Sequence, residues 1–107
     1  MPVVQNNHAA GPDNCEFLVF TTSRFDRELK KLVAHHSELP ERYRDIIAAL
    51  RQDPHNRSRR YLIKKLQGAQ ADDGQYRIRS GRFRFRYDID AQAVYLKACS
   101  LRREDSY

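Results

Sequence analysis

Hydrophobic and polar residues alternate strictly over residues 76–89, a stretch that reads YRIRSGRFRFRYDI. Arginines occupy every second position on both sides of a Ser-Gly pair, and aromatic or aliphatic residues fill the positions between them. Because successive side chains of a β-strand point to opposite faces, this pattern predicts two strands that share one basic face and one apolar face. Glycine supplies the positive φ that tight turns need, so Ser80-Gly81 is the predicted two-residue hairpin loop.

This loop sets a register that the pattern supports. The predicted cross-strand pairs are Arg79–Arg82, Ile78–Phe83, Arg77–Arg84 and Tyr76–Phe85. Every pair is like with like, whereas a slip of one residue would mix the two faces. Like charges directly opposite cost up to roughly 1 kcal/mol per pair, and no acidic residue interrupts the five arginines between Arg77 and Arg86. The pattern therefore favours a surface that binds a polyanion, with a solvated outer face as the alternative.

Upstream of the hairpin, the pattern predicts one strand and two helices. Residues 16–21 (EFLVFT) form a short apolar run that is typical of a buried strand. Apolar residues then recur at helical spacing over residues 23–36, with Thr22 or Ser23 as the N-cap. They do so again over residues 40–53, where one proline lies at the start and another follows the end. Residues 1–15 are polar and are predicted to form a flexible N-terminal extension.

The last part of the chain predicts one more strand, over residues 94–101, after a turn at Ala91-Gln92. The pairs that continue the apolar face are then Ile89–Val94, Tyr87–Leu96 and Phe85–Ala98. Lys97 joins the basic face opposite Arg86, and Asp88 lies on that face as well. Residues 61–66 (YLIKKL) are of uncertain type. The order strand, helix, helix and three strands predicts an α+β fold of the β-α-α-β-β-β type, with a mostly antiparallel, twisted sheet and both helices packed on one face.

Composition narrows the possible partners. The chain has 107 residues, enough for one domain, and a formal net charge of +6, which favours nucleic acid or another acidic partner. No apolar run is long enough to span a membrane and no secretory signal is present, so a cytoplasmic protein is expected. The glycines form no phosphate-binding loop, and the four histidines and two cysteines show no zinc-ligand spacing. No metal or cofactor is therefore expected.

Several of these features together resemble the RelE/ParE toxin superfamily. They are the strand and two helices, a Leu-Gln-Gly step at residues 66–68, the arginine hairpin, and the VYLKACSLRRE segment with a closing tyrosine. The resemblance covers residues 16–107. In the RelE branch it implies an mRNA interferase that enters the ribosomal A site and cuts the bound mRNA without a metal. The ribose 2′-OH attacks the adjacent phosphate, and catalysis depends on alignment and on stabilising the charge on the phosphorane oxygens.

The resemblance also implies roles for individual residues. Arg77 and Arg79 match two basic strand positions that are lysines in the best-known member of the family, and Arg84 matches an arginine that contacts the scissile phosphate. Arg102 or Arg103 matches a later basic position in charge stabilisation or leaving-group protonation, and Tyr107 matches a tyrosine that stacks on a base or assists proton transfer. Arginine is a poor general base because its pKa exceeds about 12, so Arg77 and Arg79 are expected to clamp phosphate. Glu104 and Asp105 either substitute for the base or belong to a solvated tail.

The remaining cations of the basic face, Arg82, Arg86 and Lys97, are predicted to bind RNA. Two other functions stay open: a ParE-like inhibitor that binds DNA gyrase, and a degenerate toxin that keeps only antitoxin binding. All three predict a cognate antitoxin, an acidic or amphipathic segment lying across the domain. The resemblance further implies that the ribosome and mRNA are partners, and that operator DNA is contacted only through the antitoxin.

Overall fold

The fold is a five-stranded mixed β-sheet with two helices, as seen in a computed structural model that describes residues 16–68 and 73–102. The elements are β1 (Leu18–Thr21), α1 (Ser23–Val33), α2 (Leu39–Gln52), β2 (Ile63–Lys65), β3 (Tyr76–Ser80), β4 (Phe83–Asp90) and β5 (Ala93–Leu101). The strand order is β1-β5-β4-β3-β2, with β1 parallel to β5 and every other pair antiparallel. The predicted α+β class is confirmed, but the segment of uncertain type is a strand, β2, at one edge of the sheet.

The two helices begin and end for local reasons. Thr22 is the N-cap of α1: its hydroxyl accepts a hydrogen bond from the Phe25 N–H at 3.2 Å and donates one to the Leu96 carbonyl at 3.0 Å. Helix α1 ends at Val33, earlier than the apolar spacing predicted, and His36 lies beyond it against the Phe83 ring. Helix α2 ends at Gln52 with Asp53 as its C-cap, because Asp53 precedes a proline and such a residue is disfavoured in helical conformation.

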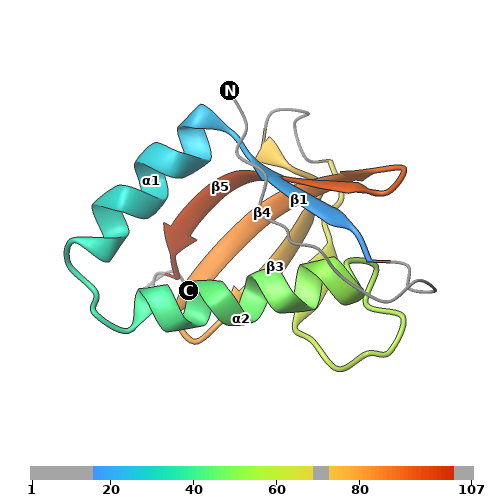
Figure 1. Ribbon diagram of the computed structural model, residues 1–107, viewed down its shortest axis with the longest axis horizontal. Coiled ribbons are helices and arrows are strands. Elements are labelled where there is room, and N and C mark those ends of the chain that lie inside the picture. Colours follow the sequence, from blue (N-terminus) through green and yellow to red (C-terminus); the bar gives the residue numbers. More distant parts are fainter. Residues whose placement is uncertain (1–15, 69–72, 103–107) are drawn as a thin grey trace.

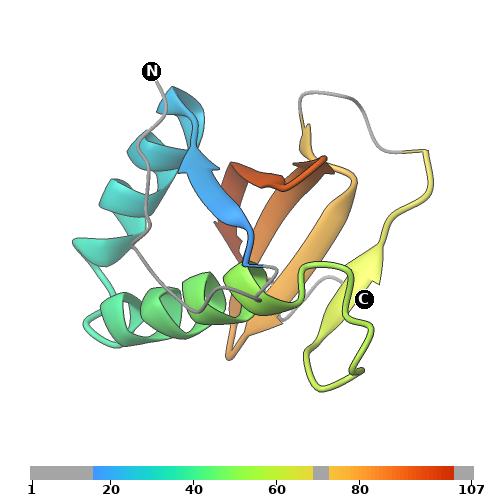
Figure 2. The same cartoon turned by 45° about the vertical axis from the view of Figure 1, so that its right-hand side comes forward.

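Both helices contribute to one core on one face of the sheet. The rings of Phe25 in α1 and Tyr43 in α2 lie 6.4 Å and 6.2 Å from the ring of Phe85 in β4. The helices diverge from the loop that joins them, so that α1 follows β5 while α2 crosses below β1 and β3 (Figures 1 and 2). The apolar positions of the alternating strands are buried here, as predicted; they include Ile78, Phe83, Phe85, Tyr87, Val94 and Leu96.

The register of the β3–β4 hairpin differs from the predicted one by two residues. The loop is Gly81-Arg82, and the pairs are Ser80–Phe83, Arg79–Arg84, Ile78–Phe85, Arg77–Arg86 and Tyr76–Tyr87. Gly81 has φ +63 at the first loop position, where type II′ turns require glycine. A shift of two residues leaves each side chain on its face, so the basic and apolar faces are as predicted although the partners are not.

The β4–β5 hairpin confirms the predicted turn at Ala91-Gln92 and corrects the pairing beyond it. Ile89 pairs with Val94 and Tyr87 with Leu96, but a bulge follows between Arg86 and Tyr87. Phe85 therefore lies opposite Cys99 rather than Ala98, and Lys97 falls within the bulge instead of facing Arg86.

The first strand is buried on one face only. Val19 and Thr21 point into the core, whereas Phe20 stacks on Tyr95 across the strand pair and Leu18 is 46 % exposed. A continuous apolar run is therefore compatible with a half-buried strand here, because its outward phenylalanine finds an aromatic partner on β5. Among residues 16–68 and 73–102, neither helix is long and apolar enough to cross a membrane.

Candidate nucleic-acid interface

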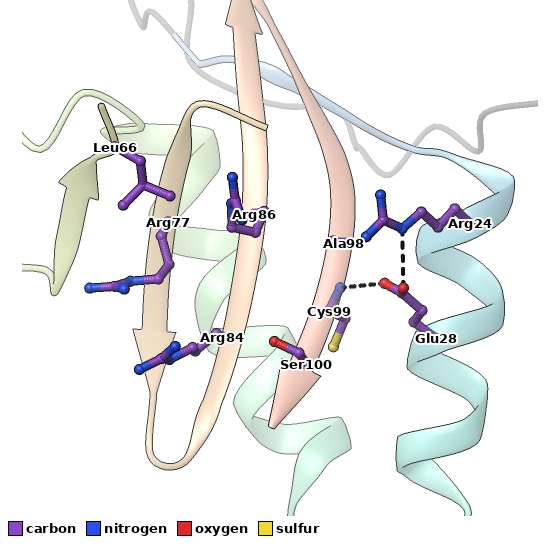
Figure 3. A pocket seen from close by; sticks show the side chains of 9 residues that line it. All are labelled: Arg24, Glu28, Leu66, Arg77, Arg84, Arg86, Ala98, Cys99 and Ser100. Atoms are coloured by element: carbon purple, nitrogen blue, oxygen red, sulfur yellow. Dashed lines mark hydrogen bonds and ion pairs between the residues drawn. The ribbon is translucent and has the colours of Figure 1, made fainter. Parts of the chain in front are cut away.

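A shallow pocket of about 170 Å³ lies on the sheet face opposite α2 (Figure 3). Four arginines and one glutamate line it together with smaller side chains; the lining residues are Arg24, Glu28, Leu66, Arg77, Arg84, Arg86, Ala98, Cys99 and Ser100. The strand alternation places Arg77, Arg84 and Arg86 there, since each has a core residue on either side of it in sequence. The predicted basic face is therefore a hollow rather than a flat sheet surface.

Two of the four arginines are held by the protein itself. Arg24 in α1 pairs with Asp73 at 2.9 Å and with Glu28 at 3.1 Å. The Arg86 guanidinium donates two hydrogen bonds to the Gly74 carbonyl, at 2.8 Å and 3.2 Å. Gly74 can approach β4 this closely because it has no side chain: a Cβ there would lie 2.7 Å from the Tyr87 nitrogen. Arg24 and Arg86 therefore contribute to the shape of the pocket, and their guanidinium groups are already engaged by protein oxygens.

The other two, Arg77 and Arg84, have their Nε atoms buried and without a hydrogen-bond partner among the described residues. Neither guanidinium forms an ion pair with any residue in the described part of the chain. Burial, and next the nearby charge of Arg84, lowers the pKa of Arg77. A buried donor that is left unsatisfied costs about 1–3 kcal/mol, and more when it is charged. An anion bound between the two arginines would remove this cost, and a phosphate oxygen fits a guanidinium in geometry and charge.

The other predicted residues are placed differently. Arg79 lies opposite Arg84, but it lines a second pocket of about 280 Å³ beside α2. Arg82 is a loop residue and pairs with Glu38 at 3.3 Å, and Lys97 pairs with Asp88 at 3.9 Å. The charges of Arg82 and Lys97 are thus partly compensated within the protein.

Only the first residue of the predicted C-terminal site lies within the described residues. The Arg102 backbone N–H donates to the Arg82 carbonyl at 2.6 Å, which ties the end of β5 to the hairpin loop. Arg102 is exposed, and its positive charge contributes, after burial and the charges of the nearer arginines, to lowering the pKa of Arg77. The predicted site residues Arg103 and Tyr107, the candidate bases Glu104 and Asp105, and the predicted extension over residues 1–15 all lie outside the described residues.

Sequence reasoning missed three side chains at this face. Arg24 and Glu28 come from α1, and their spacing in sequence indicates only a solvated helix surface. The Glu28 carboxylate accepts a hydrogen bond from the Cys99 N–H at 2.8 Å (Figure 3) and so satisfies the backbone in the part of β5 that extends beyond its pairing with β1. Lys64 in β2 lies directly opposite Arg77. The Lys-Lys pair of YLIKKL could have indicated Lys64, but its side chain can be assigned to a face only when that segment is known to be a strand.

Cys99 lines the pocket but is not expected to act as a nucleophile. Burial, and secondarily the charge of Glu28, raises the pKa of its thiol to about 12, so the reactive thiolate is scarce at neutral pH. We expect iodoacetamide at pH 8 to leave Cys99 unmodified in the native protein and to modify it after unfolding in guanidinium, as read by peptide mass mapping. Rapid modification of native Cys99 would show that the pocket is more open than described.

The arrangement is suited to holding an anion and has few groups that could move a proton. The one carboxylate of the pocket, Glu28, is already engaged by Arg24 and by the Cys99 N–H. No group of three histidine, cysteine or acidic side chains within residues 16–68 and 73–102 is placed to hold a metal ion. The expectation that the protein needs no metal stays a prediction.

Comparisons of this chain with models of protein families, with curated proteins and with solved structures find no match.

Proposed function

We propose that the protein is the toxin of a type II toxin–antitoxin pair, with a RelE-type fold, and that it cleaves mRNA in the ribosomal A site. The observation that carries this proposal is the pair Arg77 and Arg84, half-buried on the open face of the sheet, whose Nε atoms are buried and have no hydrogen-bond partner among the described residues. A protein that needed only a stable sheet would gain by pairing or removing these charges. The sequence resemblance supplies the particular polyanion, RNA.

In this proposal the reaction is an in-line displacement at phosphorus. The ribose 2′-oxygen forms a bond to the adjacent phosphorus, and the bond from phosphorus to the 5′-oxygen breaks, leaving a 2′,3′-cyclic phosphate and a 5′-hydroxyl. Arg77 and Arg84 stabilise the negative charge that builds on the phosphoryl oxygens, which is a large effect in a partly buried site. The 2′-OH proton is taken up by solvent water with assistance from Tyr107, and Arg102 or Arg103 stabilises or protonates the departing 5′-oxygen.

The proposed partners follow from this role. The toxin acts on the ribosome and its mRNA, which places it in the cytoplasm. The cognate antitoxin is an acidic or amphipathic segment, because the face that it must cover carries Arg77 and Arg84, which form no ion pair with any of the described residues. Operator DNA is contacted only through the antitoxin.

The direct test is cleavage of mRNA on programmed ribosomes by the purified protein, read by primer extension. We expect cuts within the A-site codon and no cuts in the same mRNA without ribosomes. A matched preparation with both Arg77 and Arg84 changed to alanine should be inactive. Intact A-site mRNA would contradict the proposal. Inhibition of gyrase supercoiling in a parallel assay would then indicate a ParE-like inhibitor, and activity in neither assay would indicate a degenerate toxin.

A further inference from the structure

Two neighbouring lysines of β2 lie on opposite faces of the sheet. Lys64 is directly opposite Arg77, and directly opposed residues of antiparallel strands have their side chains on the same face. Lys64 therefore lies on the open face with the arginines. Lys65 is opposite Tyr76, on the face of the core, where its ammonium group lies 5.7 Å from the centre of the Tyr76 ring. Both lysines are exposed, so they differ in direction and not in burial.

The strand pairing arranges the cations of the open face in two rows across the sheet. One row is Lys64, Arg77 and Arg86, and the other is Arg79 and Arg84. The two arginines with unsatisfied Nε atoms, Arg77 and Arg84, come from different rows, which are about 7 Å apart along the strands. Lys64 extends the row of Arg77 toward the edge of the sheet. Neither row contains an acidic residue; Asp88 falls in the next row, where it is engaged by Lys97 and by the Gln75 N–H.

The direction of the unpaired arginines extends this arrangement toward the edge of the sheet. The guanidinium groups of Arg77 and Arg84 both extend toward the side of β2, away from α1 (Figure 3). An anion that meets them there lies close to Lys64. Lysine is a compact charge on a flexible stem and, being exposed, it can follow a phosphate that is not held rigidly.

We propose that Lys64 binds a second phosphate, next to the one held by Arg77 and Arg84, so that the open face grips two successive phosphates of one RNA strand. This inference rests on the proposed function only in taking RNA as the polyanion. Its site, the edge strand β2, is separate from the residues proposed to take part in bond cleavage. Lys64 thus positions the strand and sets how firmly the flanking nucleotide is held.

The test is the salt dependence of RNA binding by the full chain. The probe is a fluorescent ten-nucleotide RNA with 2′-O-methyl groups, which cannot be cut because the attacking hydroxyl is blocked; binding is read by anisotropy over a series of salt concentrations. For single strands each phosphate contact contributes about 0.7 to the slope of log affinity against log salt. We expect Lys64→Ala to reduce the slope by about 0.7 and the affinity severalfold. Lys64→Arg should retain both, and Lys65→Ala, which removes the same charge one residue away, should match the wild type.

The outcomes separate this inference from the proposed function. Equal effects of Lys64→Ala and Lys65→Ala, or no binding by the wild type, would overturn it, whatever the ribosome assay shows. A reduced slope for Lys64→Ala alone, with A-site mRNA left intact, would support the second phosphate contact and reject the proposed cleavage. Far-UV circular dichroism and a melting curve for each variant check that the fold is unchanged, which is expected because Lys64 is exposed.

Discussion

Replacing Arg84 with alanine is expected to slow A-site mRNA cleavage by roughly 10²–10³-fold, the loss that follows removal of one preorganised donor to a developing negative charge. Arg84 is the sharper choice of the two arginines because its strand, β4, is the central strand of the sheet, whereas β3, which carries Arg77, pairs on one side with the three-residue edge strand β2. The backbone that carries Arg84 is therefore held on both sides, and a neighbouring side chain is not expected to move into its place and restore the cleavage rate.

The same substitution is expected to leave the free energy of unfolding unchanged or to raise it. Arg84 lies opposite Arg79, and such like-charge pairs cost about 0.2–1 kcal/mol. Its buried Nε also has no partner among the described residues. Removing the side chain relieves both costs. If Arg84 served mainly to stabilise the fold, its replacement would lower the free energy of unfolding. The cleavage rate and the unfolding free energy, measured together, therefore distinguish a functional arginine from a structural one.

The measurements are single-turnover cleavage on programmed ribosomes and urea unfolding followed by circular dichroism. Arg44→Ala is the matched control, since it removes the same charge from an exposed position on α2, outside both pockets. We expect that control to keep most of the cleavage rate. If Arg84→Ala cleaved at the wild-type rate, or lost stability in proportion to its activity, the phosphate clamp would be wrong.

The part of this fold that could be predicted from sequence is the part set by alternation. A period of two assigns each side chain to a face without reference to any distant residue, so Phe83, Phe85 and Tyr87 were placed in the core correctly. The same argument placed Arg77 and Arg84 on the opposite face. Because alternation is unchanged by a shift of two residues, it could not choose between a Ser80-Gly81 loop and the observed Gly81-Arg82 loop.

The remaining features depend on contacts between distant segments. Whether an arginine has a hydrogen-bond partner depends on which distant segment packs beside it. Arg86 donates to the Gly74 carbonyl, whereas the buried Nε of Arg77 has no partner among the described residues. The bulge that places Lys97 beside Asp88 breaks the simple count along β5. Strand β2 has only three residues, too few for a periodic signal, and its identity follows from pairing with β3.

Replacing Phe85 with alanine is expected to reduce the free energy of unfolding by about 3–5 kcal/mol, the range for a buried phenylalanine. Phe85 is fully buried and its ring contacts the rings of Phe25 and Tyr43, so it joins both helices to the central strand. Domains of this size have only about 5–15 kcal/mol of stability in total, and this one change should therefore unfold a measurable fraction of the protein at 37 °C. Urea unfolding followed by circular dichroism measures the loss.

Phe20→Ala is the matched control, because Phe20 is half-buried on the other face and stacks on Tyr95 at 5.3 Å; its loss should be only about 1–2 kcal/mol. Equal losses for the two variants would mean that the core does not lie on the helix side. The magnitudes also explain why the arginine ladder is tolerated. Burying one large apolar side chain contributes about 1.5–3 kcal/mol, whereas each like-charge pair costs at most about 1 kcal/mol. Phe85 lies between Arg84 and Arg86 on β4. The free energy gained by burying its side chain on the core face therefore exceeds the cost of placing like charges on the opposite face of the same strand.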